Sequence, residues 1–331
     1  MEITEHDKNR EVTRIPYDKM DDYLAEVKGD SYREYRCRFN NAKFHHIRTE
    51  VPLELHLELV SWCNLRCKMC YRSFIPDKER VAMPREMIDE IVSQSIEMGL
   101  SSIHLGLNTE PILHPDIIEV LKKLASINPQ DFWLRTNGIA LTREISELIT
   151  EIPLTKLSVS IDAATKESYK KIRGGDYDVV IRNLQNFLDI RNKKELRLPF
   201  LRVTMVEQED NRNEIDMFRE FWRDKADVID IQELIDFGYI NKQNSMTRQK
   251  YSAFECPFTY HYYALSISHD GRMRPCCFAN HEVDVLPPTF LGDCSIKEYW
   301  NCKATKEFIK MVEDRQYSGS CLDCLASVYK D

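Results

Sequence analysis

The sequence predicts an α/β protein, a partial (β/α)6 barrel of the TIM type followed by a small cysteine-rich domain. Strand-like runs alternate with amphipathic helical segments from residue 53 to about residue 238, which is the pattern of parallel sheets covered by helices. The alternation then stops, and the remaining chain contains seven of the eleven cysteines. These two observations separate a barrel from a second region with a different chemistry.

The first β-α unit pairs the run LELHLELV (53–60), which is interpreted as an apolar strand, with an amphipathic helix at 84–99. Pro84 suits the first turn of that helix, and Gly99 suits its C-terminal stop. The further predicted strands are 101–107, 131–137, 154–162, 196–206 and 227–234, and the further helices are 115–127, 142–150, 177–191 and 213–222. In such folds the reactive loops follow the C-terminal ends of the strands.

Three regions are expected along the chain. A polar lead-in, helical or irregular, comes first, the barrel is second, and the cysteine-rich domain is third: 1–50, 51–240 and 241–331. The polar, non-periodic stretch 241–254 is interpreted as a linker. The stretch 263–277 resembles a hairpin whose turn is His269-Asp270-Gly271.

Composition excludes several classes of function. The net charge of −8 argues against a nucleic-acid-binding surface, because phosphate binding depends on clustered Lys and Arg. The charged N-terminus is no secretory signal, and no apolar run is long enough to cross a bilayer, so no membrane association is expected. We therefore predict a cytoplasmic protein. In that reducing compartment, the cysteines indicate metal or redox chemistry rather than disulfides.

The segment WCNLRCKMC (62–70) places Cys63, Cys67 and Cys70 in one loop directly after the first strand, with no fourth cysteine beside them. Three thiolates can hold three irons of a [4Fe–4S] cluster and leave the fourth iron open. The open iron could chelate the amino and carboxylate groups of S-adenosylmethionine. An electron passed into the sulfonium would then break a carbon–sulfur bond and release a carbon radical. A zinc knuckle with a distant fourth ligand, or buried thiols, are the alternatives.

The spacing Cys63-x3-Cys67-x2-Cys70, with Met69 before the last cysteine, resembles the radical SAM superfamily. The resemblance implies reductive cleavage of S-adenosylmethionine to a 5′-deoxyadenosyl radical, which abstracts hydrogen from a substrate C–H bond. It also implies an electron donor of the flavodoxin or ferredoxin type.

The same resemblance implies contacts to S-adenosylmethionine. The family carries a Gly-Gly-Glu-Pro-like run after strand two, where this chain has Asn108, Thr109, Glu110 and Pro111, so the paired glycines are missing. Three further residues resemble family positions near the cosubstrate, of which the arginine would reach the carboxylate through a bidentate fork: Asn137, Ser160 and Arg173.

Cys256, Cys276, Cys321 and Cys324, with Gly271-x4-Cys276 after a turn, resemble the SPASM/twitch extension of radical SAM enzymes. Only seven residues follow Cys324, which favours the shorter twitch form with one auxiliary [4Fe–4S] cluster. Four ligands would close that cluster, so it would carry electrons rather than bind substrate. A tetrahedral zinc site is the alternative.

Four cysteines remain outside both sets, and buried thiols are the simplest interpretation of them: Cys37, Cys277, Cys294 and Cys302. Cys294 or Cys302 could serve as a hydrogen-atom donor, as radical epimerases require.

The predicted reaction is a two-electron oxidation (dehydrogenation) or an epimerisation of a small polyhydroxylated molecule such as a sugar or an aminocyclitol. A ribosomal-peptide maturase that crosslinks or epimerises its substrate is the alternative, although only about fifty residues precede the first strand, which favours a small molecule. A non-catalytic zinc-binding module is a third hypothesis.

Overall fold

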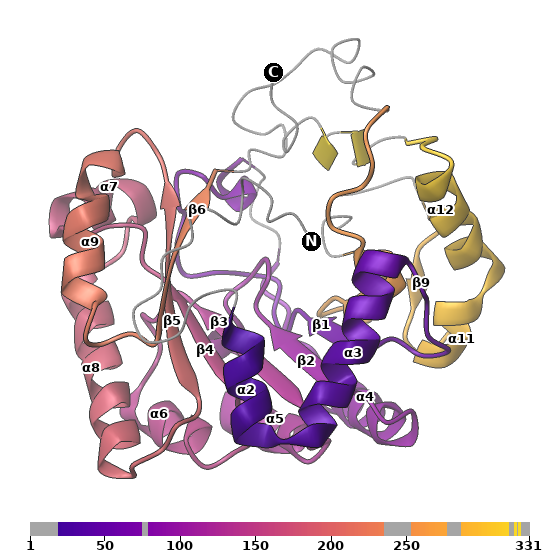
Figure 1. Ribbon diagram of the computed structural model, residues 1–331, viewed down its shortest axis with the longest axis horizontal. Coiled ribbons are helices and arrows are strands. Elements are labelled where there is room, and N and C mark those ends of the chain that lie inside the picture. The colour runs from indigo at the N-terminus through magenta and orange to yellow at the C-terminus, as the bar shows by residue number, and fades with distance from the viewer. Residues whose placement is uncertain are drawn as a thin grey trace.

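A computed structural model describes residues 19–74, 79–234, 253–276, 286–317, 321–322 and 324–325. Its centre is a nine-stranded sheet in the order β6-β5-β4-β3-β2-β1-β7-β8-β9 (Figure 1). The strands are β1 (Glu54–Leu57), β2 (Ser102–Leu105), β3 (Asp131–Thr136), β4 (Lys156–Ser160), β5 (Phe200–Glu207), β6 (Val228–Glu233), β7 (Ala264–Ile267), β8 (Arg272–Arg274) and β9 (Thr289–Phe290). All six predicted barrel strands are present.

The barrel is open. Strands β1 to β6 pair in parallel and in sequence order, but β1 takes β7 as its other neighbour, with Glu54 opposite Ala264. The C-terminal region therefore extends the barrel sheet. Strands β7 and β8 form the predicted hairpin, and the turn between them includes Gly271, which has φ +83°. Most of the predicted linker, 241–252, lies outside the described residues.

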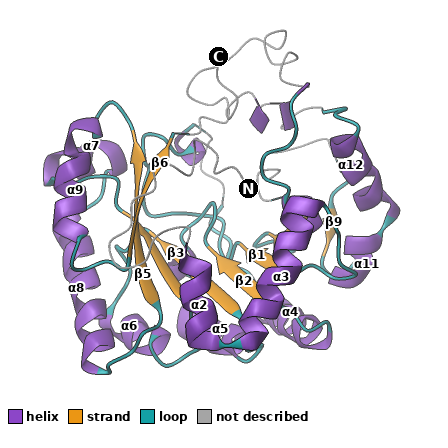
Figure 2. Cartoon of the chain, viewed as in Figure 1, coloured by secondary structure: helices purple, strands orange, loops and turns teal. Residues whose placement is uncertain are grey.

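The helices cover the outer face of the sheet, and Figure 2 shows α6, α8 and α9 grouped along one flank of the strands. They are α4 (Arg85–Glu97), α5 (Ile117–Ala125), α6 (Arg143–Ile149), α7 (Lys166–Arg173), α8 (Tyr177–Lys193), α9 (Ile215–Trp222) and α11 (Ile296–Asn301). Helix α12 (Lys303–Glu313) packs instead in a separate apolar cluster that includes Tyr262 and Tyr263. Short 3-10 turns are η2 (Tyr71–Ser73), η3 (Pro111–Leu113), η4 (Arg212–Glu214) and η6 (Tyr260–Tyr262). None of the helices in the described ranges is long and apolar enough to cross a bilayer.

Helix α7 was not predicted. Its N-cap is Thr165, whose side chain accepts a hydrogen bond from Ser168 N, and its C-cap is Gly174 with φ +77°. Only eight residues lie between these caps, so the apolar periodicity is too short to stand out from the sequence.

Two N-terminal helices, α2 (Met20–Lys28) and α3 (Asp30–His45), cover the N-terminal ends of the strands (Figure 1). Lys28 Nζ donates to Pro129 O at 3.1 Å before β3, and Arg38 donates to Ser101 Oγ at 2.8 Å before β2. The lead-in is thus helical from residue 20 to residue 45. The opposite end of the sheet, where the strands finish, carries the cysteine loop.

The interpretation of 53–60 as an apolar strand was wrong in one respect. Alternate side chains of a strand point to opposite faces, so Leu55 and Leu57 enter the outer apolar core while Glu54, His56 and Glu58 face inward. The inner face is polar on other strands too, where Lys156 forms an ion pair with Asp131. The interior of the open barrel is therefore lined by polar side chains rather than by an apolar core.

Candidate active site

The cysteine loop is held by backbone contacts. Cys70 N donates to Cys67 O at 3.0 Å, and Ser73 Oγ donates to the same oxygen at 2.8 Å. Lys68 N donates to Ile172 O at 2.7 Å, which joins the loop to α7. The loop therefore has a defined conformation before any metal is considered.

Glu58, at the C-terminal end of β1, anchors the loop after β2. Its carboxylate accepts hydrogen bonds from Leu107 N at 3.0 Å, from Asn108 N at 2.8 Å and from Thr109 Oγ1 at 2.5 Å. Burial raises the pKa of Glu58, and these donors oppose that rise. The predicted cosubstrate-binding loop is thus shaped by a residue that sequence reasoning missed.

Gly106 at the start of this loop could not be replaced. Its φ is +78°, and a Cβ there would lie 2.5 Å from Arg135 O and 2.6 Å from Pro111 Cδ. The close approach of two backbones requires a residue without a side chain.

Glu110 joins the loops that follow β2 and β3. It accepts from Thr136 Oγ1 at 2.7 Å and from Asn137 N at 2.7 Å. Burial raises its pKa to about 7, because the surrounding hydrogen bonds only partly offset the loss of water. Both carboxylate oxygens have protein partners, so Glu110 orients the site from within the fold.

Asn137 brings the β3 loop to the first cysteine. Its Nδ2 lies 3.6 Å from Cys63 Sγ and donates to Asn64 Oδ1 at 2.7 Å. The predicted residue therefore lies at the cysteine loop.

Arg173, at the end of α7, is a buried cation of the site. It forms an ion pair with Asp162, whose other oxygen accepts from Val206 N at 2.7 Å. Ser160, two residues before Asp162, ends β4 and is half-buried. The arginine is thus fixed at the carboxyl ends of β4 and β5, and Asp162 is a second residue that sequence reasoning missed.

The three thiols fit a cationic metal cluster. Burial raises the pKa of Cys63, Cys67 and Cys70, that of Cys67 to about 12, and the positive charge of Arg173 opposes the rise at all three. Thiolates in such a buried position need a positive charge nearby. Bound iron would supply that charge and would keep the coordinated thiols deprotonated.

The C-terminal thiols gather as well. Burial raises the pKa of Cys256 and of Cys321, the latter to about 12, and Cys276 raises both further because its charge is close. Cys324 is half-buried, and Cys277 lies outside the described residues. Cys256, Cys276 and Cys321 are therefore close enough to interact, and such a set of thiols fits an iron–sulfur cluster as well as a zinc ion.

The two candidate hydrogen donors, Cys294 and Cys302, pack against the outer apolar core. Cys302 Sγ caps α12 and accepts from Thr305 N at 3.4 Å. Helix α11, which lies between the two cysteines, is joined to α4 by Ile296 N donating to Gln94 Oε1 at 2.7 Å. Both thiols therefore lie on the helix-covered side of the sheet, against the outer apolar core.

Comparison with known families decides the class. The model of the radical SAM superfamily matches residues 57–220, and the model of the SPASM iron–sulfur cluster-binding domain matches residues 256–325. The chain belongs to the radical SAM superfamily. A radical SAM enzyme binds S-adenosylmethionine and a [4Fe–4S] cluster, and the SPASM domain adds auxiliary iron–sulfur binding. Membership argues against a non-catalytic zinc-binding module.

A curated relative and two solved structures show what this chain is similar to. A probable GTP 3′,8-cyclase of Methanocaldococcus jannaschii is 26% identical over 275 residues, covering 72% of this chain and 90% of the relative. Streptococcus suis SuiB bound to its precursor peptide SuiA has a TM-score of 0.64 at 16% identity, covering 88% of this chain and 75% of SuiB. BtrN in complex with AdoMet and 2-DOIA has a TM-score of 0.53 at 16% identity, covering 80% and 89% of the two chains. The structural matches support the fold.

Proposed function

We propose that this radical SAM enzyme removes hydrogen from a C–H bond of a small polyhydroxylated molecule and carries out a dehydrogenation or an epimerisation. Cys63, Cys67 and Cys70 would hold the cluster that binds S-adenosylmethionine, and a second cluster would lie on the auxiliary set, Cys256, Cys276, Cys321 and Cys324. When bound, the first cluster and S-adenosylmethionine supply the 5′-deoxyadenosyl radical. The chain's own residues bind and orient the reactants.

The polar inner face of the sheet carries this proposal. Arg202 on β5 contacts Ser158 Oγ at 3.4 Å and forms an ion pair with Asp230 on β6, while Gln232 Nε2 donates to Asp230 at 2.6 Å. Thr204 lies one step nearer the strand ends. These polar side chains are mostly buried and paired with one another, and a polar interior below the reactive loops favours a substrate rich in hydroxyl groups.

Cosubstrate recognition is assigned to the strand-end loops. Arg173 would bind the carboxylate of S-adenosylmethionine through its guanidinium, which suits a carboxylate geometrically. Asn108, Thr109, Asn137 and Ser160 would bind its polar groups, and Glu110 would hold two of these loops in register.

A nucleotide cyclisation is the second candidate, because curated relatives that match at 26% and 24% identity are named probable GTP 3′,8-cyclase and GTP 3′,8-cyclase. Modification of a peptide is the third, since SuiB was solved with its precursor peptide. A nucleotide also carries sugar hydroxyl groups, so the first two candidates differ mainly in the size and charge of the substrate.

Deuterium transfer into 5′-deoxyadenosine tests these candidates. The reconstituted enzyme is given dithionite, S-adenosylmethionine and perdeuterated substrates of three classes: cyclitols and sugars, GTP, and short peptides. The proposal expects one-deuteron enrichment with the first class and none with Cys67→Ala. Enrichment with GTP or a peptide alone would replace it by the corresponding alternative.

The electron donor is proposed from surface charge. Arg66, Lys68, Lys170 and Lys171 are exposed around the cysteine loop, and of these Lys68 and Lys171 both form ion pairs with Asp210. A basic rim attracts an acidic flavodoxin or ferredoxin and accelerates encounter. Such a donor is consistent with a cytoplasmic enzyme.

A further inference from the structure

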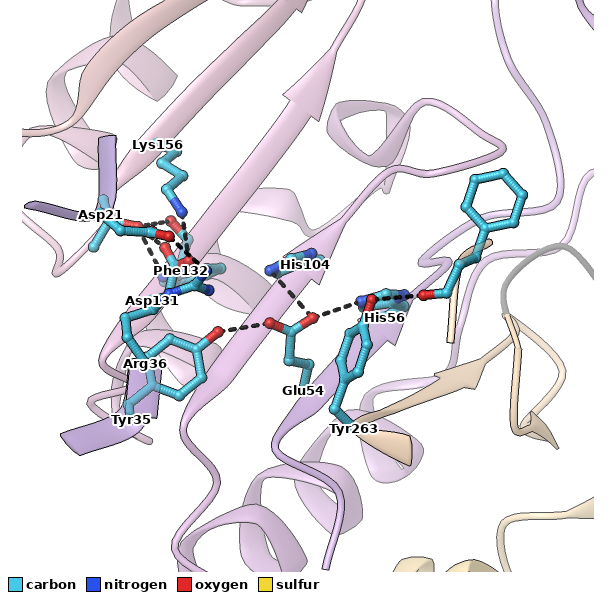
Figure 3. A network of polar contacts seen from close by, with 12 residues as sticks. Asp21, Tyr35, Arg36, Glu54, His56, His104, Asp131, Phe132, Lys156 and Tyr263 are labelled. Atoms are coloured by element: carbon cyan, nitrogen blue, oxygen red, sulfur yellow. Dashed lines mark hydrogen bonds and ion pairs between the residues drawn. The ribbon is translucent and has the colours of Figure 1, made fainter. Parts of the chain in front are cut away.

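A second group of metal-binding side chains lies on the inner face of the sheet. Glu54 and His56 are two residues apart on β1, and His104 on β2 lies directly opposite His56 in the parallel register. The three donor atoms, one from each residue, all lie within 4.8 Å of one another. Figure 3 shows the three side chains together. Glu54 Oε2 lies 3.2 Å from His56 Nε2 and 3.9 Å from His104 Nε2.

The group is deeply buried and incompletely hydrogen-bonded. Glu54, His56 and His104 are 2%, 2% and 6% exposed. Within the described part of the chain, neither ring nitrogen of His104 and not Nδ1 of His56 has a hydrogen-bond partner. Buried ring nitrogens without partners are uncommon because their desolvation is not repaid, and such atoms are what a metal ion would engage.

The carboxylate is held in place from outside the group. Tyr35 Oη on α3 donates to Glu54 Oε1 at 2.6 Å, which leaves Oε2 directed toward the two imidazoles. Supporting hydrogen bonds of this kind orient a metal ligand.

Three cations lie near the group. Arg36 forms its ion pair with Asp21, and Lys156 forms its ion pair with Asp131. Arg135 lies close enough to both histidines for its charge to lower their pKa. Burial lowers the pKa of both His56 and His104, which favours the unprotonated rings that bind metals. A buried carboxylate oxygen of Glu54 therefore faces two imidazole rings.

We propose that Glu54, His56 and His104 bind a divalent transition-metal ion, Zn²⁺ or Fe²⁺, at a site separate from both cysteine sets. Two histidines and one carboxylate are an established donor set for these ions. Tetrahedral bonds of about 2.05 Å place donors roughly 3.3 Å apart, so binding requires a small closure. The imidazole rings stack at 12°, and one ring must turn so that the metal lies in both planes.

The position indicates a bracing role. The ion would join β1 to β2 and, through Tyr35, to α3 at the end of the barrel away from the cysteine loop. Glu58, which anchors the loop after β2 that contains Asn108 (the Asn108 loop), follows His56 by two residues and faces the same side of the sheet. A metal here would hold the strand that supports the cosubstrate loop.

Zinc binding to the reconstituted holoenzyme tests the proposal. Protein with about eight irons per chain is equilibrated anaerobically with Zn²⁺ and desalted, and zinc and iron are quantified. We expect about one zinc per chain in the native protein, with only nitrogen and oxygen neighbours in zinc-edge X-ray absorption. His104→Ala and Glu54→Gln should each weaken zinc binding at least tenfold without lowering the iron content.

His261→Ala is the matched control, since this histidine is equally buried but lies outside the group, and it should keep the zinc. No additional zinc, zinc with sulfur neighbours, or zinc retained by both site variants would overturn the proposal. If the variants fail to fold, the X-ray absorption spectrum of the native protein decides alone.

Discussion

The two cysteine sets differ in how the chain assembles them. Cys63, Cys67 and Cys70 belong to one loop that is hydrogen-bonded to its own residues and to α7. The auxiliary set is drawn from separate segments, with Cys256 before η6 and Cys276 after β8. Local geometry builds the first set, and tertiary packing builds the second, so the two should fail in different ways.

Ligand removal should separate the sets most strongly. Cys67→Ala should lower the rate of S-adenosylmethionine cleavage by at least about 100-fold, because three thiolates are the minimum that holds an open cluster. Cys276→Ala should keep cleavage but lose substrate turnover. Chromatographic assay of 5′-deoxyadenosine and of product measures both. If Cys276→Ala also stopped cleavage, the proposed division of labour would be wrong.

Acid should destabilise the auxiliary region. His261 packs beside Phe308 in the apolar cluster that also contacts Cys256 and Cys321, and burial lowers its pKa to about 3. The unfolded chain takes up a proton near pH 6.5 but the folded chain does not, so stability is full above pH 6.5 and falls as pH drops toward 3.

Between pH 7 and pH 5 this histidine should cost the native protein about 2 kcal/mol relative to His261→Gln. Thermal unfolding midpoints of the holoenzyme and the variant at both pH values measure the difference. If the unfolding midpoints of the two proteins fell by the same amount, His261 would not be the cause of the acid sensitivity.

The Glu58 anchor tests how far the first set depends on its neighbours. Glu58→Gln replaces an acceptor of backbone N–H groups by an amide that serves fewer of them, so the Asn108 loop should lose order. We expect about tenfold weaker binding of S-adenosylmethionine, near 1.4 kcal/mol. Calorimetric titration compares it with Glu50→Gln, an exposed control that should bind normally.

Surface charge should have the smallest effect. Lys170→Glu, which breaks no ion pair within the described part of the chain, should slow reduction by flavodoxin roughly threefold at low salt and leave dithionite-driven turnover unchanged. Lys122→Glu on α5 is the exposed control. Stopped-flow reduction at two salt concentrations measures the effect, and an equal loss with dithionite would point to damage at the site instead.

Sequence reasoning predicted the strands, most helices and the first cysteine set, because each depends on local periodicity or short spacing. The auxiliary set spans distant segments and was inferred from the family resemblance. Sequence reasoning missed α7, whose apolar pattern spans too few residues, and it misjudged the run that contains Glu58. The polar residues Glu54, His56 and Glu58 alternate with leucines in the sequence, and this pattern could have predicted a polar inner face. Asp162 carried no such pattern, since its role depends on an arginine on another element.

The sequence by itself determined the class of chemistry, because three cysteines in one loop are brought together by the chain's own connectivity. Only the tertiary structure decided that β7 pairs with β1, that Arg173 lies within electrostatic reach of the thiols, and that His104 lies opposite His56. These are contacts between distant segments, and their distances depend on strand order and register, which side-chain patterns alone do not specify.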